Sequence, residues 1–132
     1  MIKNNVTRLL DTHQIPYQVF ELSPEKHGAL ETARLLGVPA EQVFKTIVVT
    51  RDGKGKPILA IIPGVAEVDL KLLAKAINEK KLTLPSERQA EALTGLQAGG
   101  ISPLALLNRG FEMVLDETAL LFDEIHISGG QR

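Results

Sequence analysis

Apolar positions along the chain fall into two spacings, one typical of helices and one typical of strands. Helical spacing, together with helix-capping residues, predicts helices in both halves of the chain. These helices span residues 2–12, 29–36, 70–78 and 87–93. Asp69 and Ser86 stand at the expected N-cap positions, Gln89 completes a capping box with Ser86, and Gly37 ends the second helix.

Alternating and β-branched runs predict the strands of a sheet. The clearest strand covers residues 43–50, and a hairpin-type turn at 52–57 leads into a returning strand at 58–63. Shorter strands are expected at 17–22, 82–84, 112–115 and 124–128, and a turn or short helix at 117–121. Helices and strands mix without strict alternation, which predicts an α+β fold with a curved, mixed or largely antiparallel sheet.

Length and composition narrow the class of protein. The 132 residues, of which 44% are hydrophobic, fit a single domain, 1–132, with one core. The net charge of −1 argues against binding to long nucleic acid, because such binding grows with the number of phosphates neutralised. DNA is therefore not an expected partner, and an RNA partner should be held over a short footprint, for which a local basic patch is enough.

The absence of cysteine excludes disulfides, thiolate metal sites and a cysteine nucleophile. No apolar run approaches the roughly 20 residues that cross a bilayer, and the N-terminus lacks the apolar region of a signal peptide. We therefore expect no membrane partner and a cytoplasmic location. The standard motifs of serine hydrolases, zinc proteases and nucleotide-binding enzymes are missing. His13, His27 and His126 show no ligand spacing, so neither a metal nor another cofactor is expected.

Lys45 is an unusual residue for its strand. Alternation places it on one face with Ile47 and Val49, so a cation shares a face with branched apolar residues. In one interpretation the stem lies on the sheet and the ammonium reaches water. In the other, the side chain projects into a cavity and meets an anionic or carbonyl group. The strand pattern alone favours the first interpretation.

Two glycine-containing turns are further candidates. In Gly99-Gly100-Ile101-Ser102-Pro103, the glycines let a ligand approach the main chain, and consecutive N–H groups can hold an oxyanion or a phosphate. Ser128-Gly129-Gly130 follows directly on a predicted strand, which is a common position for a site. Each segment taken alone is equally compatible with an ordinary turn.

Together, these three features resemble the YbaK family, which is related to the editing domain inserted in many bacterial prolyl-tRNA synthetases. The resemblance rests on the order and spacing of three segments, and it extends over nearly the whole chain. The segments are Val43-Phe44-Lys45-Thr46-Ile47-Val48-Val49, Thr94-Gly95-Leu96-Gln97-Ala98-Gly99-Gly100-Ile101-Ser102-Pro103-Leu104 and Ile127-Ser128-Gly129-Gly130-Gln131-Arg132. The resemblance implies an open, barrel-like mixed sheet flanked by helices.

The resemblance also implies a deacylase that acts in trans on mischarged tRNA, holding its acceptor end. YbaK-type members remove cysteine from tRNA(Pro) and can act on Cys-tRNA(Cys), and the thiol of the substrate is thought to attack the carbonyl. Thr46, directly after the lysine, resembles the cysteine type more than the alanine type. Deacylation of Ala- or Ser-charged tRNA, or a non-catalytic module that binds tRNA or prolyl-tRNA synthetase, remain alternatives.

Residue roles follow from matching the motifs. Lys45 is expected to orient the aminoacyl group or the terminal ribose-phosphate, while Gly100 and Ile101 present backbone N–H groups to the carbonyl. Substrate-binding residues are expected to be Gly99, Ser102, Pro103, Ser128, Gly129 and Gly130. Thr46 lies on the opposite strand face and is read as structural. The family usually continues beyond this motif with an acidic residue and a terminal helix, so the resemblance predicts that a C-terminal segment is missing after Arg132.

Overall fold

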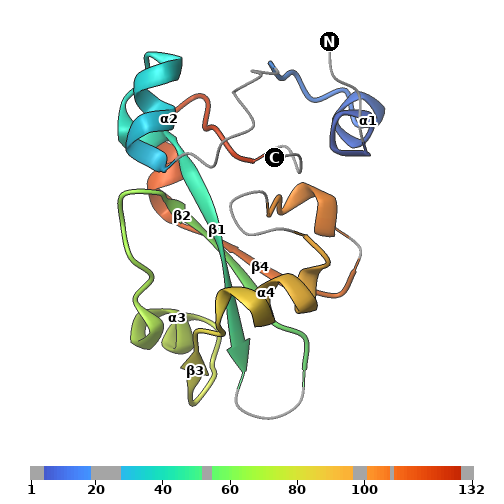
Figure 1. Cartoon of the computed structure of the whole chain (residues 1–132), viewed down its shortest axis with the longest axis vertical. Coiled ribbons are helices and arrows are strands. Elements are labelled where there is room, and N and C mark those ends of the chain that lie inside the picture. Colours follow the sequence, from blue (N-terminus) through green and yellow to red (C-terminus); the bar gives the residue numbers. More distant parts are fainter. Residues whose placement is uncertain (1–4, 19–27, 52–54, 97–100, 108, 129–132) are drawn as a thin grey trace.

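A four-stranded sheet forms the centre of the computed structural model, which describes residues 5–18, 28–51, 55–96, 101–107 and 109–128 (Figure 1). The strands are β1 (Phe44–Arg51), β2 (Ile58–Pro63), β3 (Leu82–Thr83) and β4 (Glu112–Leu115). Their order in the sheet is β3-β1-β2-β4. β1 pairs antiparallel with both β2 and β3, whereas β4 runs parallel to β2. The predicted α+β fold with a mixed sheet is therefore confirmed.

Helices surround this sheet. The α-helices are α1 (Asn5–Thr12), α2 (Ala29–Leu36), α3 (Leu70–Ala76) and α4 (Glu87–Thr94). Short 3-10 helices are η1 (Ala40–Gln42), η2 (Leu104–Leu106) and η3 (Glu117–Leu121). No helix in the described part of the chain is long and apolar enough to span a membrane.

Capping residues explain where the helices begin and end. The Asp69 side chain accepts hydrogen bonds from the backbone N–H groups of Lys71 and Leu72, and so begins α3. Ser86 and Gln89 form the predicted capping box at the start of α4. Gly37 ends α2 with φ 69°, a left-handed conformation that glycine adopts without steric cost.

The side of the sheet that carries Lys45 is called the Lys45 face. In the β1–β2 register, Lys45 lies opposite Ile62, Ile47 opposite Ala60 and Val49 opposite Ile58, and paired residues share a face. A buried cluster on this face contains Val49, Ile58 and Ala60, which pack with Leu73 and Ala74 of α3 and Leu82 of β3. α3 therefore covers the far half of the Lys45 face, away from Lys45.

The opposite side of the sheet is called the Thr46 face. Val48 and Leu59 are paired on it and form a second buried cluster with Leu106 of η2. Ala90 of α4 and Ile101 pack against this cluster. Figure 1 shows α3 and α4 on opposite sides of β1. The sheet is thus the middle of three layers, with α3 on one side and α4 and η2 on the other.

Several sequence predictions differ from the structure. The expected strand 124–128 is wrong, because only a single bridge, between Val43 and His126, forms there. The third helix ends at Ala76 rather than at 78, since Asn78 has φ 60° and leaves the helical region. Most of the expected strand 17–22 lies outside the described residues. Residues 117–121, which were expected to form a turn or short helix, form the 3-10 helix η3.

Candidate functional site

Lys45 lies near the start of β1, at the end of the Lys45 face that α3 leaves uncovered. Its side chain is partly exposed, and it makes no hydrogen bond or ion pair with any described residue. The neighbouring side chains on this face are Ile47, which is partly buried, and Ile62, which is buried. An unpaired ammonium beside apolar side chains is available to an anionic or carbonyl group brought by a ligand.

The segment containing Ser128 lies against this part of β1. Val43 and His126 form a parallel bridge, in which the N–H of Phe44 donates to the carbonyl of His126 at 2.9 Å. The N–H of His126 in turn donates to the carbonyl of Gln42, also at 2.9 Å. The bridge is isolated, and no strand pairing continues from it to Lys45 and Ser128. The structure therefore brings the segment that contains Ser128 to the start of β1, the strand on which Lys45 lies.

Ile101, Ser102 and Pro103 lie differently from the sequence-based expectation. Ile101 packs against the cluster of Val48 and Leu59, which places it on the Thr46 face rather than the Lys45 face. Ser102 is fully buried, and its Oγ has no hydrogen-bond partner within the described residues. Pro103 is also buried. Gly99, Gly100, Gly129 and Gly130 fall outside the residues that the structure describes.

The packing of Ile101 on the Thr46 face makes Thr46 an additional candidate for the functional site. It is partly exposed and shares its face with Val48, against whose cluster Ile101 packs. Thr46 was expected to be structural because it lies on the strand face opposite Lys45. The signal that could have identified Thr46 is its alternation with Lys45. Together, adjacent residues of one strand supply a cation to one face and a hydroxyl to the other.

The chain enters the 95–103 segment through a fixed turn. The buried Thr94 hydroxyl donates to the carbonyl of Ala90 at 2.9 Å and accepts from the N–H of Leu96 at 3.1 Å. Gly95 has φ 76° and ends α4, with its N–H bonded to the carbonyl of Glu91. Because Leu96 and Ile101 both pack on the Thr46 face, this turn helps to set the path of the segment.

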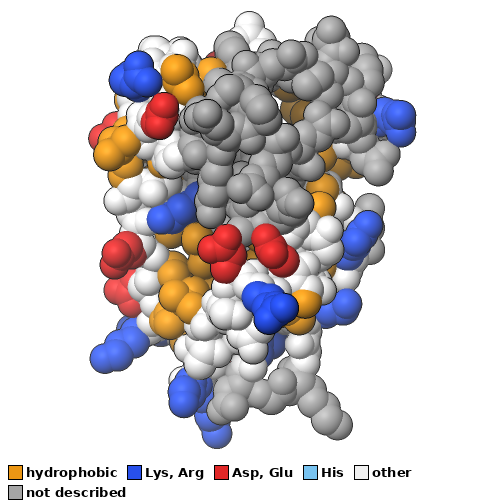
Figure 2. Space-filling model, in the orientation of Figure 1, with side chains coloured by type: hydrophobic (Ala, Val, Ile, Leu, Met, Phe, Trp, Pro, Cys, Tyr) orange, Lys and Arg blue, Asp and Glu red, His pale blue; other side chains and the backbone are white. Residues whose placement is uncertain are grey.

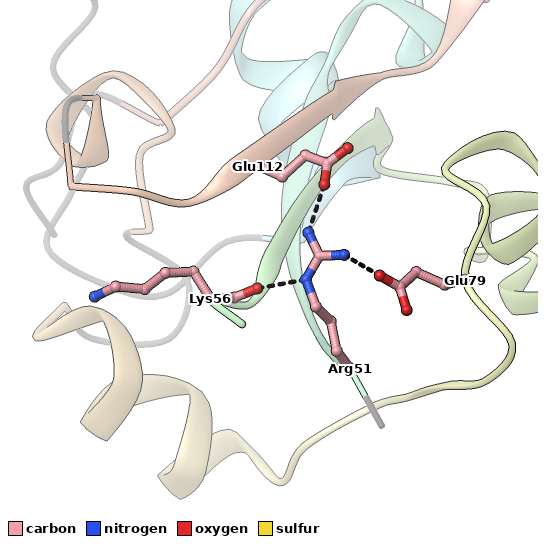
Figure 3. A network of polar contacts seen from close by, with 4 residues as sticks. All are labelled: Arg51, Lys56, Glu79 and Glu112. Atoms are coloured by element: carbon pink, nitrogen blue, oxygen red, sulfur yellow. Dashed lines mark hydrogen bonds and ion pairs between the residues drawn. The ribbon is translucent and has the colours of Figure 1, made fainter. Parts of the chain in front are cut away.

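At the opposite end of β1, Arg51 joins three parts of the fold (Figure 3). Its guanidinium donates to Glu79 after α3 and to Glu112 of β4, and its Nε donates to the carbonyl of Lys56 at 2.8 Å. The bond to Glu112 raises the pKa of Arg51, and the desolvation caused by burial opposes this effect. The Arg51 side chain is only 13% exposed. We interpret this network as structural, because all three hydrogen bonds join Arg51 to the protein itself.

The described residues contain no group of three or more His, Asp or Glu side chains placed to hold a metal ion. His13 is exposed near the end of α1, His126 bridges to β1, and His27 lies outside the described residues.

Comparison with known proteins identifies the family. Residues 23–132 match the family described as "Aminoacyl-tRNA editing domain". The chain belongs to this family. The YbaK-type resemblance of the sequence motifs is thereby confirmed.

Relatives of known sequence and structure agree with this assignment. "Putative Cys-tRNA(Pro)/Cys-tRNA(Cys) deacylase EbsC" of Enterococcus faecalis is 38% identical over 132 residues, which cover 98% of this chain and 79% of that protein. The proline–tRNA ligase of Nitratidesulfovibrio vulgaris is 31% identical over 110 residues, which cover 83% of this chain but only 18% of the ligase. A solved structure described as "a putative trans-editing enzyme for prolyl tRNA synthetase" has the same fold, with a TM-score of 0.79 at 24% identity, and the match covers 99% of this chain and 83% of that one.

Proposed function

We propose that this protein is a trans-editing deacylase that removes cysteine from mischarged tRNA(Pro), and that Cys-tRNA(Cys) is a second substrate. The observation that carries the proposal is membership of the editing-domain family together with the similarity to the E. faecalis relative. The name of that relative supplies the choice of cysteine, and activity on other aminoacyl esters is an outcome of the experiment.

The chemistry requires little from the protein beyond positioning. An aminoacyl ester is already activated, so orientation of the ester and stabilisation of the developing oxyanion supply most of the acceleration. A chain without cysteine has no thiol nucleophile of its own. We assign the attack to the thiol of the substrate cysteine. Its sulfur bonds to the carbonyl carbon, the ester C–O bond breaks, and the thiol proton goes to the departing ribose oxygen. The product is a cyclic thioester of cysteine, which water opens to free cysteine.

The site residues have separate roles in this proposal. Lys45 binds the aminoacyl group or the terminal phosphate through its charge, because its ammonium has no partner among the described residues. Ser128, which follows the bridge beside Lys45, forms an adjacent wall with Gly129 and Gly130. The N–H groups of Gly100 and Ile101 hold the oxyanion, Gly99 contacts the substrate, and buried Ser102 and Pro103 hold that segment in place. Thr46 faces the same side as Ile101 and contributes its hydroxyl there.

In this proposal the substrate lies across the start of β1 rather than on one face of the sheet. Lys45 and the Ile101 segment approach from opposite faces, so the terminal adenosine has to lie near the strand end, where both can reach it. The bridge between Val43 and His126 defines the boundary of this region.

A panel of charged tRNAs tests the function. Purified protein is mixed with Cys-tRNA(Pro), Cys-tRNA(Cys), Ala-tRNA(Pro), Ser-charged tRNA and Pro-tRNA(Pro), and the remaining ester is measured over time. Rapid loss from Cys-tRNA(Pro), with Pro-tRNA(Pro) preserved, is the expected result. Preferred turnover of the alanine or serine ester would reject the cysteine assignment. Tight tRNA binding without turnover of any ester would instead indicate a binding module.

A further inference from the structure

Basic residues outnumber acidic ones in the segment that contains α3 and β3. Residues 69–84, which contain α3 and β3, hold the four lysines Lys71, Lys75, Lys80 and Lys81 and only two carboxylates, a net charge of +2. Because the whole chain has a net charge of −1, the remaining residues carry −3. Residues 69–84 therefore carry a positive net charge, as do residues 45–56 of β1 and the segment after it (+3), in a protein whose overall net charge is −1.

Both carboxylates of this segment are already engaged. Asp69 accepts the hydrogen bonds that cap α3, and Glu79 forms an ion pair with Arg51. All four lysines are exposed. Lys71 and Lys75 are one turn apart on the same side of α3, while Lys80 and Lys81 lie immediately before β3. Figure 2 shows basic side chains gathered at the lower left, over α3 and β3.

The position of these lysines relative to Lys45 fits a tRNA. α3 packs on the same sheet face that carries Lys45, and β3 pairs with β1 at Thr50 and Arg51. At about 3.3 Å per residue, the six residues from Lys45 to Arg51 span roughly 20 Å. Stacked nucleotides advance about 3.4 Å along one strand, so this distance corresponds to about six nucleotides. An ester held at Lys45 thus places the first base pairs of the acceptor stem near α3 and β3.

We propose that Lys71, Lys75, Lys80 and Lys81 form a surface that binds the phosphate backbone of the tRNA acceptor stem. The inference rests on the proposed function, which identifies the nucleic acid as a tRNA. It differs from that function in assigning a second contact, remote from the ester. The contact is electrostatic and independent of sequence, because lysine meets phosphate as a point charge. It confines the RNA footprint to one side of an acidic protein.

The test compares two lysine variants with a charge-matched control. The lysine variants are Lys71→Gln/Lys75→Gln and Lys80→Gln/Lys81→Gln, and the control is Arg88→Gln/Arg109→Gln. Arg88 and Arg109 are exposed and lie outside residues 69–84, and Arg88 is flanked on α4 by Glu87 and Glu91. Each of the three variants removes two positive charges. Thermal unfolding of each variant checks that the fold is kept.

Binding of deacylated tRNA is measured from low to moderate salt. Each lysine pair should weaken binding about tenfold near physiological salt and reduce the slope of log affinity against log salt by about 1.5. The control should behave as the wild type. Equal affinity and slope in the lysine variants, or the same loss in the control, would overturn the proposal.

A short substrate separates this proposal from the proposed function. With cysteinyl ester on full tRNA(Pro), the lysine variants should show a raised KM and an unchanged kcat. With the same ester on adenosine alone, which has no stem, they should match the wild type. Equal impairment on both substrates would overturn the assignment to the stem. If the wild-type protein deacylates nothing, the proposed function fails, and the salt dependence of tRNA binding still decides whether the lysine surface exists.

Discussion

Val43 and His126 lie side by side in parallel orientation, although they are 83 positions apart in the sequence. The bridge is closed by hydrogen bonds from Phe44 to His126 and from His126 to Gln42. The Gln42 side chain adds a bond from its Nε2 to the carbonyl of Glu124 at 2.9 Å. The last described residues are therefore held beside the start of β1, where Lys45 lies.

Replacement of Lys45 tests its assignment to the site. Lys45→Ala should lower kcat/KM for Cys-tRNA(Pro) by about 100-fold or more, a loss comparable to removal of an oxyanion-hole donor. Lys45→Arg should retain part of the activity, because the charge is kept. Since Lys45 has no described hydrogen-bond partner, the free energy of unfolding should change by less than about 0.5 kcal/mol. Deacylation by Lys45→Ala at the wild-type rate would contradict the assignment.

Thr94 should contribute to stability through its hydroxyl group. Thr94→Val keeps the shape of the side chain but removes both the donor to Ala90 and the acceptor for Leu96. Because the residue is only 3% exposed, the unfolding free energy should fall by about 1–3 kcal/mol. Urea denaturation measures the difference. Thr94→Ser, which keeps the hydroxyl, should lose clearly less, and a loss in Thr94→Ser with none in Thr94→Val would show that the methyl group, not the hydrogen bonds, matters.

Arg51 should stabilise the junction of β1, β4 and the segment after α3. Arg51→Met leaves Glu79 and Glu112 without their partner, at side-chain exposures of 27% and 46%. Because these carboxylates are partly solvated, we expect a loss of about 1–3 kcal/mol, less than for a fully buried pair. Arg34→Met is the control, since its pair with Glu31 is exposed, and it should leave stability almost unchanged. Similar midpoints of thermal unfolding for the two variants would refute this role.

Gly64 should tolerate no side chain. A Cβ added there would lie 2.2 Å from the Cβ of Ala29 and 3.2 Å from the carbonyl oxygen of Val43. Gly64→Ala should therefore push α2 away from the start of β1 and cost about 1–3 kcal/mol of stability. Gly28→Ala is the matched control, because nothing lies within 4 Å of its added Cβ and its φ is −75°. Adding Ala29→Gly to Gly64→Ala should recover part of the loss, and no recovery would argue against this steric cause.

The elements that could be predicted from the sequence are those determined by residues close together in the chain. Val43–Thr50 has β-branched residues and a following turn, and the observed β1 differs by one residue at each end. The Asp69 cap and the Ser86–Gln89 capping box depend only on neighbouring residues, and both form as expected. Local interactions within a few residues therefore account for the successful predictions.

Long-range relationships were harder to predict. Alternation along β1 separates Lys45 from Thr46, but it does not indicate which face a later loop will cross. Ile101 crosses the Thr46 face because the buried cluster of Val48, Leu59 and Leu106 lies there. Similarly, residues 124–128 have strand composition, yet they meet β1 only at Val43 and continue without a ladder. The approach of this segment to the start of β1 depends on that single contact.

The parallel pairing of β2 and β4 has a further consequence for engineering this domain. Two strands that run the same way require the chain to travel back along the sheet between them, and here that route is residues 64–111. This one continuous stretch of chain thus supplies both outer layers. It first crosses one side of the sheet with α3 and then the other side with α4 and η2. Because β3 pairs with β1 midway along this route, the sheet anchors its two halves separately. A loop insertion before β3 would therefore alter the lysine-bearing side, and one after β3 would alter the Ile101 side.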